Sequence, residues 1–219
     1  KLNPKFKLLW ENLAKCYRLQ NKFIHAKKAF QNLLKLDPHN YEAMGALGTI
    51  HIRLSDFDEG IRIYKELLKY NNKNPRVHLS LGHAQKTIGS RIESETSYLN
   101  AIEHFPLCGE AYWSLANLKT YKFSDEQIQT MESALKDDMH ELEKIQMLFA
   151  LGKAHESLEN YDKSFKYYEE GNWIHRKTLD YNAEENSILI NKTIDFFDKN
   201  SNKINYESGN KTKDPIFIL

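Results

Sequence analysis

WENLAKCYRLQNKFIHAKKAFQNLLKLDPHN, residues 10–40, is the stretch that decides the fold. Its apolar and small residues recur three and four positions apart, which places them on one face of a helix. The first set is followed by a polar turn, a second set and a closing proline: Trp10, Leu13, Ala14 and Tyr17, then Ala26, Phe30 and Pro38. The stretch therefore predicts two short helices whose apolar faces meet.

The same pattern returns along the chain. Leu13-Ala14 recurs 34 residues later as Leu47-Gly48, and then as Leu81-Gly82 and Leu115-Ala116. Leu151-Gly152 continues the series after a slip of about two residues, so the join near 137–144 is irregular. A fixed period of this size is typical of stacked helical repeats. We predict five repeats, at residues 7–40, 41–74, 75–108, 109–142 and 145–178.

The spacing has a packing reason. Small residues such as Ala14, Gly48 and Gly82 let two helices approach closely, and large ones such as Phe30 and Tyr64 fill the gap to the next pair. The pattern resembles the tetratricopeptide repeat (TPR) family. That resemblance implies an all-α fold, a right-handed α-α superhelix (TPR solenoid) with a concave groove.

The remaining segments fall outside these repeats. Pro4 lies 34 residues before Pro38, which suggests that residues 1–6 are the tail of a preceding repeat. Asn182 and Glu185 are spaced like a capping box, so 183–198 is predicted to be a C-terminal capping helix. Residues 199–214 are polar and predict a linker, whereas 215–219, PIFIL, are typical of a strand.

Charge and motifs narrow the function classes. The formal net charge is +1, so no global field favours nucleic acid or membrane. Residues 1–36 carry nine basic and one acidic residue (+8), and residues 122–170 carry six lysines and twelve acids (−6). These are either two solvated surfaces or a basic end that meets an acidic partner or another copy of the chain.

No catalytic, cofactor-binding or metal site is predicted. The sequence has no nucleotide loop, no histidine pair at helical spacing and no Gly-x-Ser-x-Gly elbow. Cys16 and Cys108 form no metal or redox motif and suit a reducing compartment, so a cytoplasmic location is expected. Lone histidines at 51, 83 and 155 are interpreted as packing or groove residues.

The groove is the predicted site. In TPR folds, the residue after each Leu-Gly/Ala pair faces the groove, as does the residue one turn earlier. We predict partner contacts from a mixed set of charged, polar and aromatic residues: Glu11, Lys15, Thr49, His83, Trp113, Asn117, Phe149 and Lys153. The alternative is a plain scaffold surface without a bound peptide.

Residues 147–182 carry a closer resemblance. Leu151-Gly152-Lys153, Tyr161–Phe165, Glu170-Gly171-Asn172 and Tyr181 have matching places in the last repeat of bacterial TPR-containing sulfotransferases. The polar linker and PIFIL also fit, and in that family this strand opens the sulfotransferase domain. The family's cofactor, 3′-phosphoadenosine 5′-phosphosulfate, is held by a loop after the strand, and none of its catalytic or cofactor residues falls within 1–219.

Two functions follow as expectations. The chain is either the interaction arm of a sulfotransferase, recruiting or orienting an acceptor or pairing subunits, or a stand-alone TPR adaptor without catalysis. In both cases the expected partner is a protein or peptide in the groove, and self-association is a further expectation.

Overall fold

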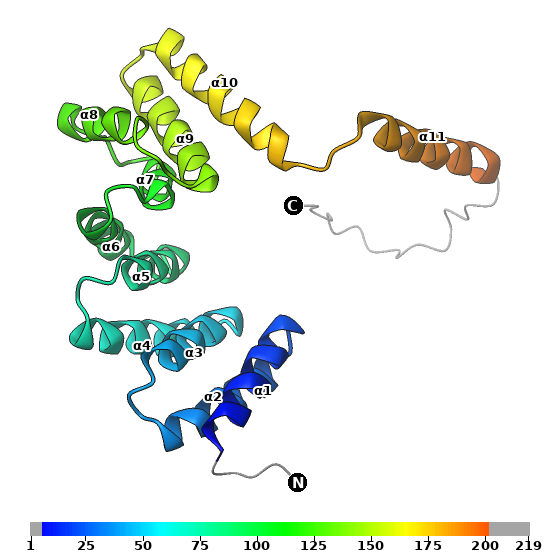
Figure 1. Ribbon diagram of the computed structural model, residues 1–219. Coiled ribbons are helices and arrows are strands. Elements are labelled where there is room, and N and C mark those ends of the chain that lie inside the picture. The colour runs from blue at the N-terminus through cyan, green and yellow to red at the C-terminus, as the bar shows by residue number, and fades with distance from the viewer. Residues whose placement is uncertain (1–5, 202–219) are drawn as a thin grey trace, which may run out of the picture. The chain divides into compact units, whose positions relative to one another are not determined.

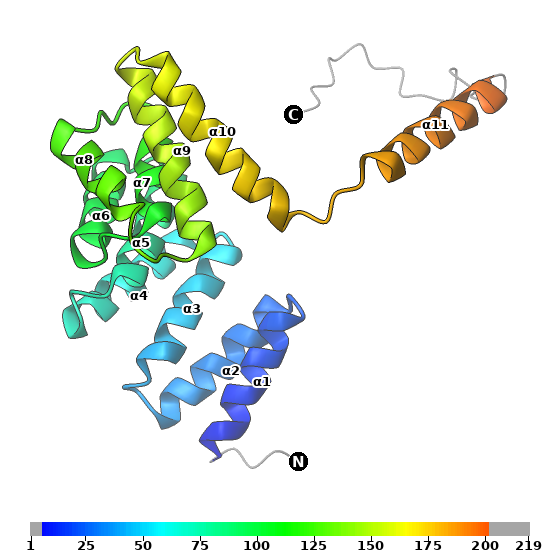
Figure 2. The same ribbon diagram turned by 45° about the horizontal axis from the view of Figure 1, so that its top comes forward.

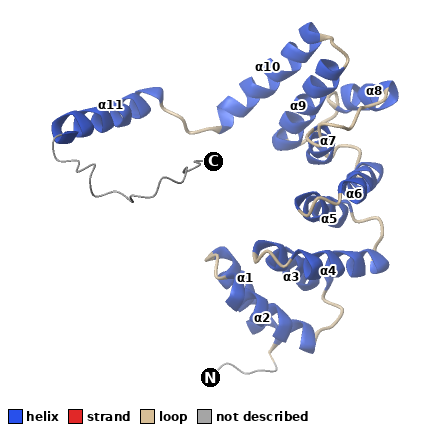
Figure 3. Ribbon diagram, turned by 180° about the vertical axis from the view of Figure 1, so that it is seen from behind, coloured by secondary structure: helices blue, strands red, loops and turns tan. Residues whose placement is uncertain are grey.

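The computed structural model describes residues 6–201 of the chain. Within this range every regular element is a helix, and no strand is present (Figure 3). The helices are α1 (Lys7–Leu19), α2 (Phe23–Leu36), α3 (Tyr41–Arg53), α4 (Phe57–Tyr70), α5 (Pro75–Thr87), α6 (Arg91–His104), α7 (Gly109–Ala116), α8 (Asp125–Ala134), α9 (Glu141–Ser157), α10 (Tyr161–Thr178) and α11 (Ala183–Asn200).

The chain divides into two compact units, Lys1–Arg176 and Lys177–Leu219. In the first unit, α1 packs on α2, α3 on α4 and α5 on α6, and each pair stacks on the next through its second helix (Figures 1 and 2). The predicted all-α solenoid of helix pairs is therefore confirmed. Stacking is required because each pair has an apolar face that it cannot bury alone.

The turn inside each pair uses one recurring backbone device. Asn21, Ser55, Gly89 and Glu159 follow the first helices with positive φ angles of 56°, 62°, 82° and 58°. The next residue in each case donates its N–H to a carbonyl five positions earlier, as Asp56 does to His51. This left-handed closure satisfies carbonyls at the helix end. It returns the chain sharply, so the second helix lies against the first.

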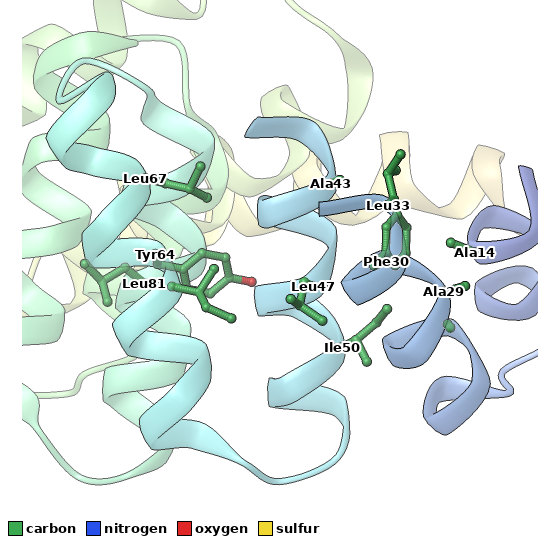
Figure 4. Close-up of a cluster of buried hydrophobic side chains, with 12 residues drawn as sticks. Ala14, Ala29, Phe30, Leu33, Ala43, Leu47, Ile50, Tyr64, Leu67 and Leu81 are labelled. Atoms are coloured by element: carbon green, nitrogen blue, oxygen red, sulfur yellow. The ribbon is translucent and has the colours of Figure 1, made fainter. Parts of the chain in front are cut away.

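Glycine–tyrosine contacts set the spacing inside three pairs. A Cβ placed on Gly48, Gly82 or Gly152 would lie 2.9, 2.6 or 2.7 Å from Cε1 of Tyr64, Tyr98 or Tyr168. The tyrosine ring of the second helix thus occupies the space that a side chain on the first would need. Figure 4 shows Tyr64 in the core, together with Leu47 and Leu81 from the adjoining helices.

Gly82→Leu tests this contact. The added side chain meets the buried ring of Tyr98, so we expect the free energy of unfolding to fall by about 1–3 kcal/mol through overpacking. Urea unfolding followed by circular dichroism measures the change. An unaltered unfolding curve would contradict the helix register described above.

The fourth repeat departs from the regular pattern. α7 has 8 residues and α8 has 10, whereas α9 has 17 and begins at Glu141, four residues before the predicted repeat boundary at 145. α8 ends at Ala134, short of the expected 137, and the main neighbour of α7 is α9. The Glu110 N–H donates to Glu143 Oε2 at 3.1 Å. The irregular join thus adds a turn to α9 that packs on the start of α7.

The second unit contains α11, which is capped by Asn182: its Oδ1 accepts from the Glu184 N–H at 2.9 Å. The helix runs to Asn200, two residues beyond the predicted 198, so the linker predicted from 199 starts later. No residue of α11 is buried, and its capping role stays a prediction. The rest of the linker, the strand at 215–219 and residues 1–5 of the N-terminal tail lie outside the described residues.

Candidate functional site

Two pockets open on the first unit, both lined mainly by first helices of the repeats. The N-terminal pocket, of about 510 Å³, lies among α1, α3 and the α4–α5 turn, with Glu11, Lys15, Arg18, Asn40, Tyr41, Glu42, Gly45, Thr49, Tyr70, Asn71, Asn74 and Val77 in its lining. The central pocket, of about 1000 Å³, lies among α5, α7 and α9, with Arg76, Leu79, His83, Phe105, Leu107, Cys108, Glu110, Asp138, Met139, His140, Leu142 and Glu143 in its lining.

Charge is balanced in the N-terminal pocket. Lys15 Nζ donates to Glu11 Oε1 at 2.6 Å and lies 3.4 Å from Glu42 Oε1. The hydrogen bond to Glu11 raises the pKa of Lys15, which stays cationic. Arg18 adds a second positive charge, so two cations face two carboxylates. The pocket therefore has no net preference for a charged ligand.

Asparagine side chains give the N-terminal pocket its hydrogen-bonding character. Asn40 Oδ1 accepts from the Ala43 N–H at 2.9 Å, and Asn74 Oδ1 accepts from the N–H groups of Arg76 and Val77. These caps occupy the amide oxygens, and no acceptor within residues 6–201 pairs with the Asn40 or Asn74 amino group. Each amide thus keeps donors for a ligand carbonyl.

An aromatic wall stands beside these amides. The rings of Tyr41 and Tyr70 lie 4.8 Å apart, and His39 packs near both. Tyr41 is 45% exposed and Tyr70 51% exposed, so their faces are available to a partner. Large, rigid aromatic side chains are typical anchors of protein interfaces.

The central pocket holds a short hydrogen-bonded chain. Tyr98 OH lies 3.1 Å from His83 Nδ1, and His83 Nε2 lies 3.1 Å from Glu110 Oε1. Burial raises the pKa of Tyr98 to about 12, so the phenol keeps its proton and can donate to Nδ1. The hydrogen bond from His83 lowers the pKa of Glu110, which is ionised at neutral pH. A neutral imidazole satisfies both contacts and leaves the negative charge on Glu110.

The other reactive groups of the pockets do not suggest catalysis. Burial raises the pKa of Cys108 to about 11, so it stays a thiol at neutral pH and is a poor nucleophile. Within residues 6–201 no group of three or more metal-binding side chains is close enough to hold an ion. In the same range, none of the helices has the length and apolar character needed to cross a membrane.

The structure divides the predicted groove residues among several places. Glu11, Lys15 and Thr49 meet in the N-terminal pocket, where Thr49 Oγ1 lies 3.1 Å from Tyr64 OH. His83 lies in the central pocket.

The other four line neither pocket. Trp113 and Phe149 contact each other with ring centroids 5.6 Å apart, and Lys153 pairs with Glu156 at 2.7 Å. Asn117 was expected on a first helix, but α7 ends at Ala116, so Asn117 is its exposed C-cap.

Two of the three lone histidines are buried. His51 is 4% exposed and bonds Asp56 at 2.7 Å, and His155 is 5% exposed and stacks on Tyr167 with ring centroids 5.4 Å apart. Both follow the Leu-Gly pair by the same interval, so they fill equivalent positions in the second and fifth repeats. They pack between helices rather than in the pockets.

Sequence reasoning missed several lining residues. Asn40 and Asn74 lie 34 residues apart, at the turn that precedes each first helix, so the repeat itself carried a signal for them. Leu142 and Glu143 had no such signal, because they belong to the extra turn of α9 that breaks the repeat.

Comparisons with known proteins agree with the fold. Tetratricopeptide repeats are recognised at residues 17–85 and 145–171. An uncharacterized protein of Aquifex aeolicus is 29% identical over 103 residues, and the BBSome complex member BBS4 of Mus musculus is 32% identical over 82 residues. These matches take in 47% and 37% of this chain but only 14% and 16% of the relatives, so the chain spans a small part of their length.

Solved structures with the same architecture include a MamA protein, at 20% identity and a TM-score of 0.59 over 80% of this chain and 94% of that one. PilF of Pseudomonas aeruginosa has 16% identity and a TM-score of 0.58 over 81% and 78% of the two chains. YrrB, described as a TPR protein with an unusual peptide-binding site, has 17% identity and a TM-score of 0.55 over 81% and 94%. At these identities the likeness concerns the fold alone.

Proposed function

Because the chain carries tetratricopeptide repeats stacked in an all-α solenoid, we propose that it is a protein-interaction scaffold that binds an extended partner segment in the N-terminal pocket. The observation that carries this proposal is the set of asparagine amides beside an exposed tyrosine pair. The capped amides offer donors to peptide carbonyls, and the tyrosine rings offer apolar area at low entropic cost. The balanced charge suits recognition of a peptide backbone more than of a charged group.

A selection experiment tests the proposal. A phage-displayed library of random dodecapeptides is panned against the chain, and the recovered peptides are titrated against the wild type and Tyr70→Ala. We expect Tyr70→Ala to weaken binding at least tenfold, equivalent to about 1.4 kcal/mol, because an aromatic anchor is lost. Tyr161→Ala is the matched control, since Tyr161 is 65% exposed on α10 and lines neither pocket.

Two results would sink the proposal. One is the failure of any peptide to enrich above an empty support. The other is recovery of peptides that bind wild type, Tyr70→Ala and Tyr161→Ala equally, because such peptides would not use the N-terminal pocket. Thermal unfolding of each variant verifies that the fold is unchanged.

We also propose that this scaffold is the interaction arm of a sulfotransferase that uses 3′-phosphoadenosine 5′-phosphosulfate. The support is the resemblance of residues 147–182 to the last repeat of bacterial TPR-containing sulfotransferases. A stand-alone adaptor is the alternative, and the two pockets support it equally. The two free thiols favour the cytoplasm for either protein.

The gene sequence after the codon for Leu219 separates the two. A phosphate-loop sequence of the Gly-x-Pro-Arg-Ser-Gly-Thr kind would support the sulfotransferase arm. A stop codon or a further helical repeat would favour the adaptor.

A further inference from the structure

The central pocket owes its shape to the irregular fourth repeat. Its outer wall is formed by Leu142 and Glu143, which lie in the turn that α9 adds ahead of the predicted repeat boundary. Glu143 is held in place because its Oε2 accepts the Glu110 N–H at 3.1 Å. The volume of about 1000 Å³ is at the upper end of the range for pockets that enclose a small ligand, so several residues of a peptide can enter.

The charge of the central pocket differs from that of the N-terminal pocket. Three carboxylates, of Glu110, Asp138 and Glu143, face one guanidinium, of Arg76. Glu110 Oε1 accepts from His83, and no donor within residues 6–201 pairs with its Oε2. The pocket therefore presents partly enclosed negative charge that a cation can complement.

Apolar side chains frame these carboxylates. Leu142 is 56% exposed and Phe105 is 39% exposed, and Leu79 is half-buried between them in the lining. Exposed apolar groups next to unpaired carboxylates are complementary to a chain that alternates apolar and basic side chains. A free small cation would use the carboxylates alone and leave the apolar walls in water.

We propose that the central pocket is a second docking site, specific for an extended protein segment in which a lysine or arginine is flanked by apolar residues. The basic side chain pairs with Glu110 and Glu143, and its apolar neighbours cover Leu142 and Phe105. The inference depends on the scaffold function only in requiring a protein partner. The site shares no lining residue with the N-terminal pocket.

The test uses the same random dodecapeptide library, panned against the chain carrying Tyr70→Ala so that the N-terminal pocket is impaired. We expect enriched peptides to contain lysine or arginine beside apolar residues. Their affinity should fall at least tenfold in Glu110→Gln and in Leu142→Ser, and should weaken as salt is raised. Glu159→Gln is the matched control, because Glu159 is an exposed acid that lines neither pocket.

Replacing the lysine or arginine of a recovered peptide by glutamine should cause the same loss as Glu110→Gln, and no further loss in the Glu110→Gln chain. Peptides without basic residues, or with unchanged affinity for Glu110→Gln and Leu142→Ser, would overturn the assignment. So would sedimentation in which the chain alone self-associates through this pocket and Glu110→Gln abolishes the association, since the occupant would then be a second copy. Loss of Tyr70-dependent binding with the central pocket still active would instead refute only the first site.

Discussion

Gly109→Ala is expected to lower the free energy of unfolding by about 3 kcal/mol, the largest effect of any single methyl group in the chain. A Cβ at position 109 would lie 2.0 Å from the Glu143 carbonyl oxygen and 3.0 Å from the Met147 backbone nitrogen. Both atoms belong to the backbone of α9, so no side-chain rotation relieves the clash. α7 and α9 must separate, and the bond from the Glu110 N–H to Glu143 is then lost.

Gly45→Ala is the matched control for this measurement. A Cβ at position 45 would lie 3.7 Å from Leu67 Cδ1, an ordinary contact, and Gly45 is inside α3. Alanine favours the helix over glycine, so stability should rise by about 0.5–1 kcal/mol. Urea unfolding of the two variants should therefore move in opposite directions. A Gly109→Ala protein as stable as the wild type would refute the close approach of α7 and α9.

Tyr98→Ala is expected to cost about 3–5 kcal/mol, because it removes a large side chain whose exposed fraction is 0%. The ring fills the space over Gly82, where alanine would leave a cavity between α5 and α6. Calorimetry and urea unfolding measure the loss. A destabilisation below about 1 kcal/mol would show that the helices collapse into the gap and that the ring does not set their spacing.

Tyr98→Phe separates the ring from its hydroxyl. This variant keeps the packing over Gly82 and removes only the hydrogen bond to His83, so it should cost about 1 kcal/mol. It also leaves His83 Nδ1 without that donor at the edge of the central pocket. Equal destabilisation by Tyr98→Ala and Tyr98→Phe would mean that the hydrogen bond, rather than the packing, supports the pair.

The regular repeats were predictable because their packing is local. Gly82 and Tyr98 belong to one helix pair, and their repetition as Gly48–Tyr64 and Gly152–Tyr168 made the pattern visible without any coordinates. Three groove residues, Glu11, Lys15 and Thr49, meet in one pocket for the same reason: their positions follow the 34-residue period.

The predicted site fails as one continuous set where the period fails. α7 ends one residue before Asn117, and the Trp113–Phe149 pair lies outside both pockets. These positions were inferred by extending the register of the first three repeats. The short α7 and α8 and the long α9 altered that register, so residues at equivalent sequence positions no longer face the same space.

The sequence by itself determined the helix pairs, their turns and their stacking order, because small and large residues at a fixed period can pack in one way. Only the tertiary structure decided that α9 gains a turn, that this turn packs on Gly109, and that Glu110, Glu143 and Leu142 share a pocket. The physical reason is that these contacts join residues more than 30 positions apart across an irregular join. No local periodicity records such a contact, since it depends on how α7 and α9 meet.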